Sequence, residues 1–131
     1  FAPGDLITKE GAFDSWLYII LSGEVTVTKQ GTPITRITSV GATIGEMAIV
    51  DGEARSASAS ALTETTTLAI DMSITDRMTD AEREKFDSVY YRLLAKILVD
   101  RLRSTSHELS MARENVKELT DAILIQQAGK K

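Results

Sequence analysis

The chain has 131 residues, of which 43% are hydrophobic and 26% charged, proportions typical of a soluble globular protein. The net charge of −4 argues against non-specific nucleic-acid binding by this piece, and no run of 18 apolar residues predicts a membrane-spanning helix. The absence of cysteine excludes disulfides and thiolate metal sites and fits a reducing compartment, so we expect a cytoplasmic location.

Residues 1–71 have the pattern of short β-strands separated by turns. Strands are expected over Leu6–Thr8, Trp16–Leu21, Glu24–Lys29, Ile34–Ile37 and Thr65–Ile70. The second of these is an apolar run that predicts a buried strand, whereas the third and fourth alternate between polar and apolar residues, which indicates half-buried strands. Many short strands at regular spacing indicate a sandwich or a barrel.

The stretch Ile44–Ala57, which lies between these strands, combines residue types suited to a phosphate and a sugar. Gly45 can adopt backbone angles that other residues avoid, and it lets a ligand approach the main chain. Glu46 is suited to accept hydrogen bonds from a sugar hydroxyl, and Arg55 offers a planar fork of donors to a phosphate. The apolar residues Met47–Val50 are expected to pack against the core, and a tight turn should follow them.

This arrangement resembles the phosphate-binding cassette of the cyclic nucleotide-binding domain family, which includes catabolite activator proteins and protein kinase A regulatory subunits. The family pattern is roughly Gly-Glu-apolar-Ala-apolar, a short loop, and then Arg with two small residues. Here the chain has Gly45-Glu46-Met47-Ala48-Ile49 and Arg55-Ser56-Ala57. Many members carry Pro directly before the Arg, where this chain has Ala54. Residues 1–71 resemble the family's opening strands almost continuously, but without the helical segment that usually precedes them. A plain β-hairpin with a surface Glu and Arg is the alternative.

The resemblance implies a regulatory sensor without catalytic activity or a bound metal, whose ligand is cyclic AMP (cAMP), with cyclic GMP (cGMP) as the alternative. Arg55 would pair with the cyclic phosphate, and Glu46 would accept a hydrogen bond from the ribose 2′-hydroxyl. Ser56 and Ala57 would add a hydroxyl and backbone N–H groups. The expected ligand-binding residues in this region are Gly45, Glu46, Met47, Ala48, Arg55, Ser56 and Ala57.

After the strands, the period of the apolar residues changes from 2 to 3.6. Thr79-Asp80-Ala81-Glu82 is a capping box that predicts a helix start, and residues 72–78 are ambiguous and could form a short helix of their own. The helical pattern then continues to about Gln127, roughly 70 Å if it is unbroken. We expect a break near Asp87–Ser88, because a compact domain needs the chain to fold back.

Together these patterns predict an α+β fold. An antiparallel β-roll (a double-stranded β-helix, jelly-roll-like) should occupy residues 1–71. C-terminal helices, including a long amphipathic helix with a coiled-coil-like dimerisation segment, should occupy residues 72–131.

The long helix carries a heptad seam. With Leu102 at position a, all five a positions and four of the six d positions are apolar. The a positions are Ala95, Leu102, Leu109, Val116 and Ile123. Glu108 at g and Arg113 at the following e suit a parallel pair, so we expect a homodimer through residues 91–126. An amphipathic helix lying on its own domain is the alternative.

A polar pair, Thr105-Ser106, interrupts this seam. The run Arg101–Glu108 is similar to the central helix of bacterial catabolite activator proteins, in which a Thr-Ser pair meets the amino edge of adenine. In those proteins the Thr comes from one chain and the Ser from its dimer mate. The resemblance implies that Thr105 and Ser106 read the base. A tolerated polar pair that sets the register of a coil is the alternative.

Two other classes of function stay open: a ligand-free structural and dimerisation module, and the sensor fragment of a longer transcription regulator. No helix-turn-helix follows the long helix, so this piece is not expected to bind DNA in the family's way, and no membrane partner is expected. Nothing resembles a Ser-His-Asp or Cys-His set. His107 is the single histidine and cannot build a multi-His metal site.

Overall fold

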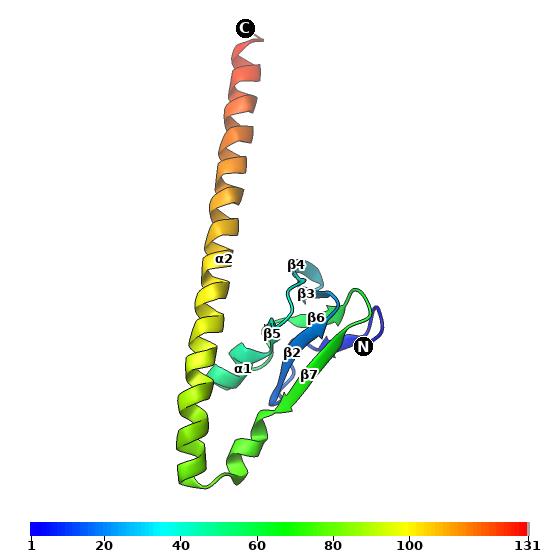
Figure 1. Cartoon of the computed structure of the whole chain (residues 1–131). Helices are drawn as coiled ribbons and strands as arrows, with labels where there is room; N and C mark the ends of the chain where they lie inside the picture. The colour runs from blue at the N-terminus through cyan, green and yellow to red at the C-terminus, as the bar shows by residue number, and fades with distance from the viewer. Residues whose placement is uncertain (131) are drawn as a thin grey trace. The chain divides into compact units, whose positions relative to one another are not determined.

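In the computed structural model, which describes residues 1–130, seven strands with one short helix among them are followed by two further helices (Figure 1). The elements in chain order are β1 (Leu6–Thr8), β2 (Trp16–Ser22), β3 (Val25–Lys29), β4 (Thr32–Ile37), β5 (Thr43–Ile44), α1 (Glu46–Asp51), β6 (Ser58–Ala61), β7 (Thr66–Asp71), the 3-10 helix η1 (Met72–Arg77) and α2 (Asp80–Ala128). The chain forms two compact units, Phe1–Tyr90 and a second that begins at Tyr91.

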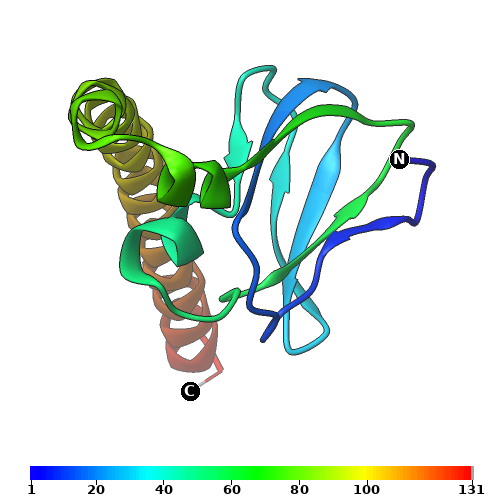
Figure 2. The same ribbon diagram turned by 90° about the horizontal axis from the view of Figure 1, so that it is seen from below.

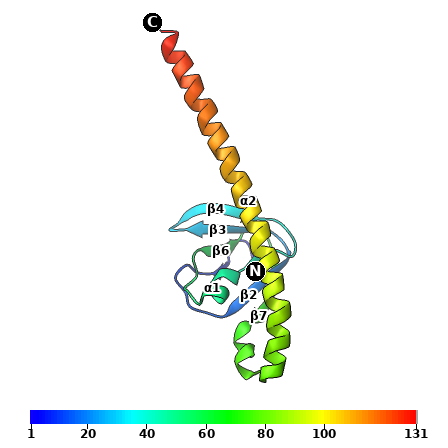
Figure 3. The same cartoon turned by 90° about the vertical axis from the view of Figure 1, so that its left-hand side faces the viewer.

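Two antiparallel sheets build the first unit. One has the strand order β1-β6-β3-β4 and the other β5-β2-β7. Figure 3 shows β4, β3 and β6 side by side, and Figure 2 shows the strands arranged around a common interior. Sheet neighbours such as β2 and β7 come from distant parts of the sequence, and they pair from Trp16 opposite Asp71 to Ser22 opposite Thr66. The predicted antiparallel β-roll followed by a long helix is confirmed.

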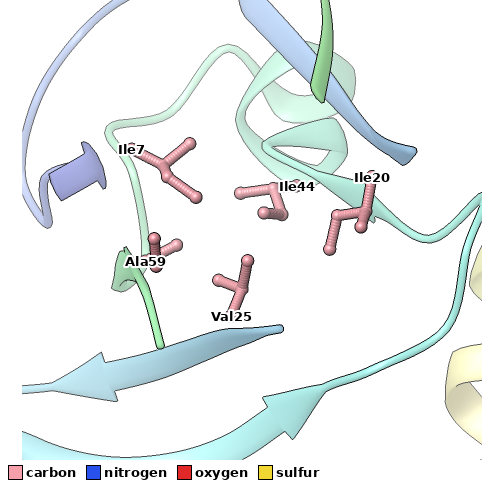
Figure 4. Close-up of a cluster of buried hydrophobic side chains, with 6 residues drawn as sticks. Ile7, Ile20, Val25, Ile44 and Ala59 are labelled. Carbon is pink, nitrogen blue, oxygen red and sulfur yellow. The ribbon is translucent and has the colours of Figure 1, made fainter. Parts of the chain in front are cut away.

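The core of the roll lies between the two sheets. Its buried side chains are aliphatic and come from five strands: Ile7, Ile20, Val25, Ile44, Ala59 and Ala61. Figure 4 shows five of these side chains directed toward one interior. Ile20 and Val25 have no exposed surface at all. Burial of such side chains is the main source of folding free energy, at about 25 cal/mol per Å² of apolar surface.

Two strand predictions need correction. In β2 only Leu17 and Ile20 are buried, and the strand is exposed at both ends, so the apolar run is less buried than its composition indicated. β4 is exposed along almost its whole length, and the prediction of a half-buried strand is wrong. The physical reason is that β4 forms the edge of its sheet and pairs only with β3.

The helical region begins as the capping box predicted. A short helix does form in the ambiguous segment 72–78: η1 covers Met72–Arg77, and α2 starts at Asp80. The backbone N–H and the hydroxyl of Thr79 both donate to Glu82 Oε2 at 2.9 Å, and the Glu82 N–H donates back to Thr79 Oγ1 at 3.4 Å. The reciprocal pair satisfies backbone donors that the first helical turn leaves free.

α2 runs without interruption from Asp80 to Ala128 (Figure 1). The expected break near Asp87–Ser88 is therefore wrong. No Gly or Pro lies between Glu82 and Gly129, so nothing in this sequence interrupts the series of backbone hydrogen bonds. Leu94 is the one buried residue of the helix. Within residues 1–130, no helix combines the length and apolar character that crossing a membrane requires.

Candidate functional site

Gly45 separates β5 from the short helix α1 and has a left-handed backbone conformation, with φ of 95°. A Cβ atom at this position would collide with the guanidinium of Arg55 and would lie 2.9 Å from the carbonyl oxygen of Trp16. Position 45 therefore requires glycine because the side chain of Arg55 packs against it. This reason adds to the one that the sequence indicated, which is the close approach of a ligand.

The segment after Gly45 forms α1, which exposes two of its four apolar side chains and half-buries the other two. Met47 and Val50 lie three residues apart on one face of the helix, and both are exposed, so the prediction that they pack against the core is wrong. Ala48 is half-buried. The expected turn is the end of α1, where Gly52 has φ of 71° and its N–H donates to the Ala48 carbonyl at 3.0 Å.

Glu46 is the buried residue of α1, and its side chain has no exposed surface. The hydroxyl of Thr43 in β5 donates to Glu46 Oε2 at 3.3 Å. A carboxylate that is completely enclosed can reach a ribose only after the groups that cover it move. The role of Glu46 toward a sugar stays a prediction.

Arg55 is 4% exposed, and its guanidinium is held by protein groups on two sides. Nη1 donates to the Gly45 carbonyl at 2.8 Å, and Nη2 donates to the Trp16 carbonyl. Asp14 occupies the remaining edge: Nε donates to its Oδ2 at 3.2 Å and Nη2 donates to its Oδ1. The hydrogen bond from Arg55 holds the pKa of the Asp14 carboxyl below its ordinary value, and partial burial opposes this effect.

Sequence reasoning missed Asp14. A single acidic residue in a loop carries no motif, and only the fold brings residues 14 and 55 together. The nearby Tyr18 has a raised phenol pKa, first because of burial and second because of the negative charge of Asp14.

The loop before β2 is also attached to Arg55 through the backbone. The Arg55 N–H donates to the Ala12 carbonyl at 2.9 Å, and the Gly11 N–H donates to the Arg55 carbonyl at 2.8 Å. After the arginine, Ser56 is exposed and Ala57 is half-buried. The structure thus brings Gly45, Glu46 and Arg55 into one region beside this loop.

Thr105 and Ser106 lie on α2 within the second unit, and both side chains are exposed. Their predicted role toward the base stays a prediction. Within the described residues, no three His, Asp or Glu side chains gather in a way that could hold a metal ion.

Comparisons with known proteins give the site a context. A sequence model of the cyclic nucleotide-binding domain matches residues 1–82. A search of curated proteins finds no match.

Among solved structures, the Thermus thermophilus catabolite activator protein is 30% identical, with a TM-score of 0.57 over 85% of this chain and 52% of that one. A cyclic nucleotide-binding domain from Methylobacillus flagellatus KT is 29% identical, with a TM-score of 0.66 over 79% and 60% of the two chains. A putative cyclic nucleotide-binding protein from Geobacter metallireducens GS-15 shares the fold at 20% identity, with a TM-score of 0.67 over 78% and 75%. The chain spans about half the length of the Thermus protein.

Proposed function

The chain belongs to the cyclic nucleotide-binding domain family, and from this premise we propose that it is a regulatory sensor for cAMP. The observation that carries the proposal is the enclosed Arg55 guanidinium, packed against Gly45 and following Glu46 in the family's cassette pattern. Other proteins of this fold support cAMP as the ligand, among them the EAL enzyme Bd1971, whose solved structure is a cAMP-bound form.

In the proposed complex, Arg55 pairs with the cyclic phosphate through two N–H donors, and Ser56 and Ala57 contribute a hydroxyl and backbone N–H groups. Glu46 accepts a hydrogen bond from the ribose 2′-hydroxyl. A carboxylate can lie in a site that binds an anion because it contacts the ribose of the ligand and not its phosphate. Met47 and Ala48 follow on α1. Occupancy of the site biases the helical region that begins at η1, and this bias reports ligand to a partner.

Preference for cAMP over cGMP has to come from groups that meet the base, since the two ligands share the ribose and the cyclic phosphate. We propose that Thr105 and Ser106 meet the adenine edge. Family members that favour cGMP often carry Thr directly after the cassette Arg, where this chain has Ser56. A mismatched edge leaves a buried polar group unpaired, at a cost of about 1–3 kcal/mol, or roughly tenfold to a hundredfold in affinity.

We further propose a parallel homodimer through residues 91–126. The a positions of the seam are exposed within a single chain, with Leu102 at 68% and Val116 at 63%. A row of exposed apolar side chains at heptad spacing is what a second identical helix covers. Glu108 and Arg113 would form an interchain pair, which contributes only about 0–1 kcal/mol when exposed but favours the parallel register.

Calorimetric titration with cAMP and with cGMP tests the ligand. Arg55→Ala should weaken cAMP binding by about 3–5 kcal/mol, because the phosphate loses its charged partner. The matched control is Arg36→Ala, which removes a largely exposed guanidinium paired with Glu24 and should leave binding unchanged. Circular dichroism establishes that both variants are folded.

Three outcomes of this titration decide between the proposals. Equal binding by the Arg55 variant and the control removes Arg55 from the site. An unchanged preference for cAMP in Thr105→Ala with Ser106→Ala removes the base-reading role and leaves the phosphate and ribose assignments in place. Heat from neither nucleotide favours a ligand-free structural module, for which the ion pair between Asp14 and Arg55 is the supporting observation.

A further inference from the structure

The guanidinium of Arg55 already holds an anion. Asp14 takes two hydrogen bonds from the edge formed by Nε and Nη2, in the paired geometry that arginine uses for carboxylates and phosphates alike. The Gly45 and Trp16 carbonyls take donors from Nη1 and Nη2. A phosphate that needs two parallel N–H donors must therefore use the edge that Asp14 now occupies.

The two partners of this ion pair differ in exposure. The Arg55 side chain is 3% exposed, whereas the Asp14 side chain is 32% exposed. Asp14 is thus the outer partner, which water already reaches, and the arginine is the inner one. An incoming anion meets Asp14 first and can replace it while the two carbonyls keep the guanidinium in place.

Resting on the proposed function, we infer that Asp14 is an internal competitor of the ligand, a carboxylate that the cyclic phosphate displaces from Arg55. The loop that carries Asp14 stays close when the exchange occurs, because Gly11 and Ala12 bond to the Arg55 backbone. The displaced carboxylate therefore remains at a high effective concentration, and the observed affinity equals the intrinsic affinity multiplied by the fraction of molecules in which Asp14 leaves the arginine free.

The residue beside Asp14 extends this exchange toward the helical region. The Ser15 hydroxyl donates to Asp71 Oδ1 at 2.7 Å, and the Ser15 carbonyl accepts from the Met72 N–H at 2.9 Å. Asp71 caps η1, since its carboxylate also accepts from the Ser73 N–H at 3.0 Å. Movement of Asp14 away from Arg55 thus pulls on the segment that bonds the start of η1.

The test compares Asp14→Asn with wild-type protein in titrations with cAMP and with inorganic phosphate, which presents anionic oxygens without sugar or base. Asn keeps the size of the side chain and removes its charge. We expect Asp14→Asn to bind cAMP about tenfold to a hundredfold more tightly, since hydrogen bonds to a charged group contribute energies of that size. Glu53→Gln is the control, because it removes one negative charge from the exposed loop before Arg55 without touching the guanidinium.

Amide hydrogen exchange at Met72 and Ser73 supplies a second readout that needs no gain in affinity. Both amides should exchange faster in wild-type protein saturated with cAMP and in ligand-free Asp14→Asn, whereas the Leu62 amide, which bonds Glu24, should not change. Unchanged exchange in both states would overturn the link through Ser15.

The outcomes separate the inference from the function on which it rests. If wild-type protein binds cAMP and Asp14→Asn binds it equally or more weakly, Asp14 is a positioning residue and the competition is wrong, while the sensor stands. If wild-type protein binds no cAMP, the proposed function is wrong, and the phosphate titration decides the rest. Tighter phosphate binding by Asp14→Asn than by wild-type protein and Glu53→Gln then supports the competition, and equal binding overturns it.

Discussion

The two compact units differ in how far they bury their apolar side chains. The first unit encloses aliphatic residues between two sheets, and Ile20 and Val25 are completely buried. In α2 only Leu94 is buried, and the apolar residues at the a positions of the heptad seam are exposed. The first unit therefore obtains its stability within one chain, whereas the seam of the second gains nothing from burial until a partner covers it.

The largest expected effect is in the core of the first unit. Ile20→Ala should lower the free energy of unfolding by about 2–5 kcal/mol, because it leaves a cavity among side chains that cannot collapse onto it. The control is Ile125→Ala, at a position that is 73% exposed and off the seam, where the change should be within about 0.5 kcal/mol.

Urea unfolding measures both variants. The fluorescence of Trp16, the single tryptophan, reports the first unit because this residue stacks on Tyr18 in β2, and circular dichroism reports α2. Comparable losses of stability in the two variants would contradict the division between a self-contained unit and an uncovered helix.

The second largest expected effect is on self-association, and it tests whether a second copy of α2 covers the heptad seam. Leu109→Asp places a charge at an a position, and we expect it to weaken self-association by about tenfold to a hundredfold or more, since a charge does not pack in a coiled-coil core. Leu124→Asp makes the same change at an exposed b position and should leave association intact. Sedimentation equilibrium at micromolar concentration gives the association constants.

A wild-type protein that stays monomeric with and without ligand would reject the dimer. Equal weakening by both variants would show that helix propensity or net charge, rather than the seam, controls association. In either variant the unfolding of the first unit, followed by Trp16 fluorescence, should stay as in wild-type protein.

How much of this could be predicted depends on whether the cause is local. The capping box at Thr79 and the alternation of β3 are local patterns, and both structures follow from neighbouring residues. The exposure of β4 depends on its position at a sheet edge, which no pattern within the strand encodes. The unbroken α2 was missed because we expected a compact domain, although the sequence itself contains no interruption.

The site divides in the same way. Gly45, Glu46 and Arg55 could be selected because they form a spaced motif within eleven residues of one another. Asp14 could not, because 41 residues separate it from Arg55 and only the pairing of the loop with the cassette brings them together. The burial of Glu46 and the exposure of Met47 follow from the helical turn of α1, which an apolar segment of only four residues does not predict.

The smallest expected effect concerns the capping box, which belongs to the first unit although the helix it starts extends into the second. Thr79→Ala removes the hydroxyl that donates to Glu82 and accepts from its N–H, and it should cost about 1 kcal/mol of stability. Thr120→Ala is the control, since that hydroxyl only bonds the Val116 carbonyl within the exposed helix, and its removal should have little effect.

The backbone N–H and then the hydroxyl of Thr79 lower the pKa of Glu82 below its ordinary value of 4.5. A carboxyl with a lowered pKa in the folded state stabilises the protein above its ordinary pKa, and this contribution disappears as the pH falls through the lower, folded-state value. The difference between wild-type protein and Thr79→Ala should therefore be constant near neutral pH and shrink in acid below about pH 4.5. Urea unfolding at several pH values measures it, and a difference that grows on acidification would show that the Glu82 carboxylate does not take part in the cap.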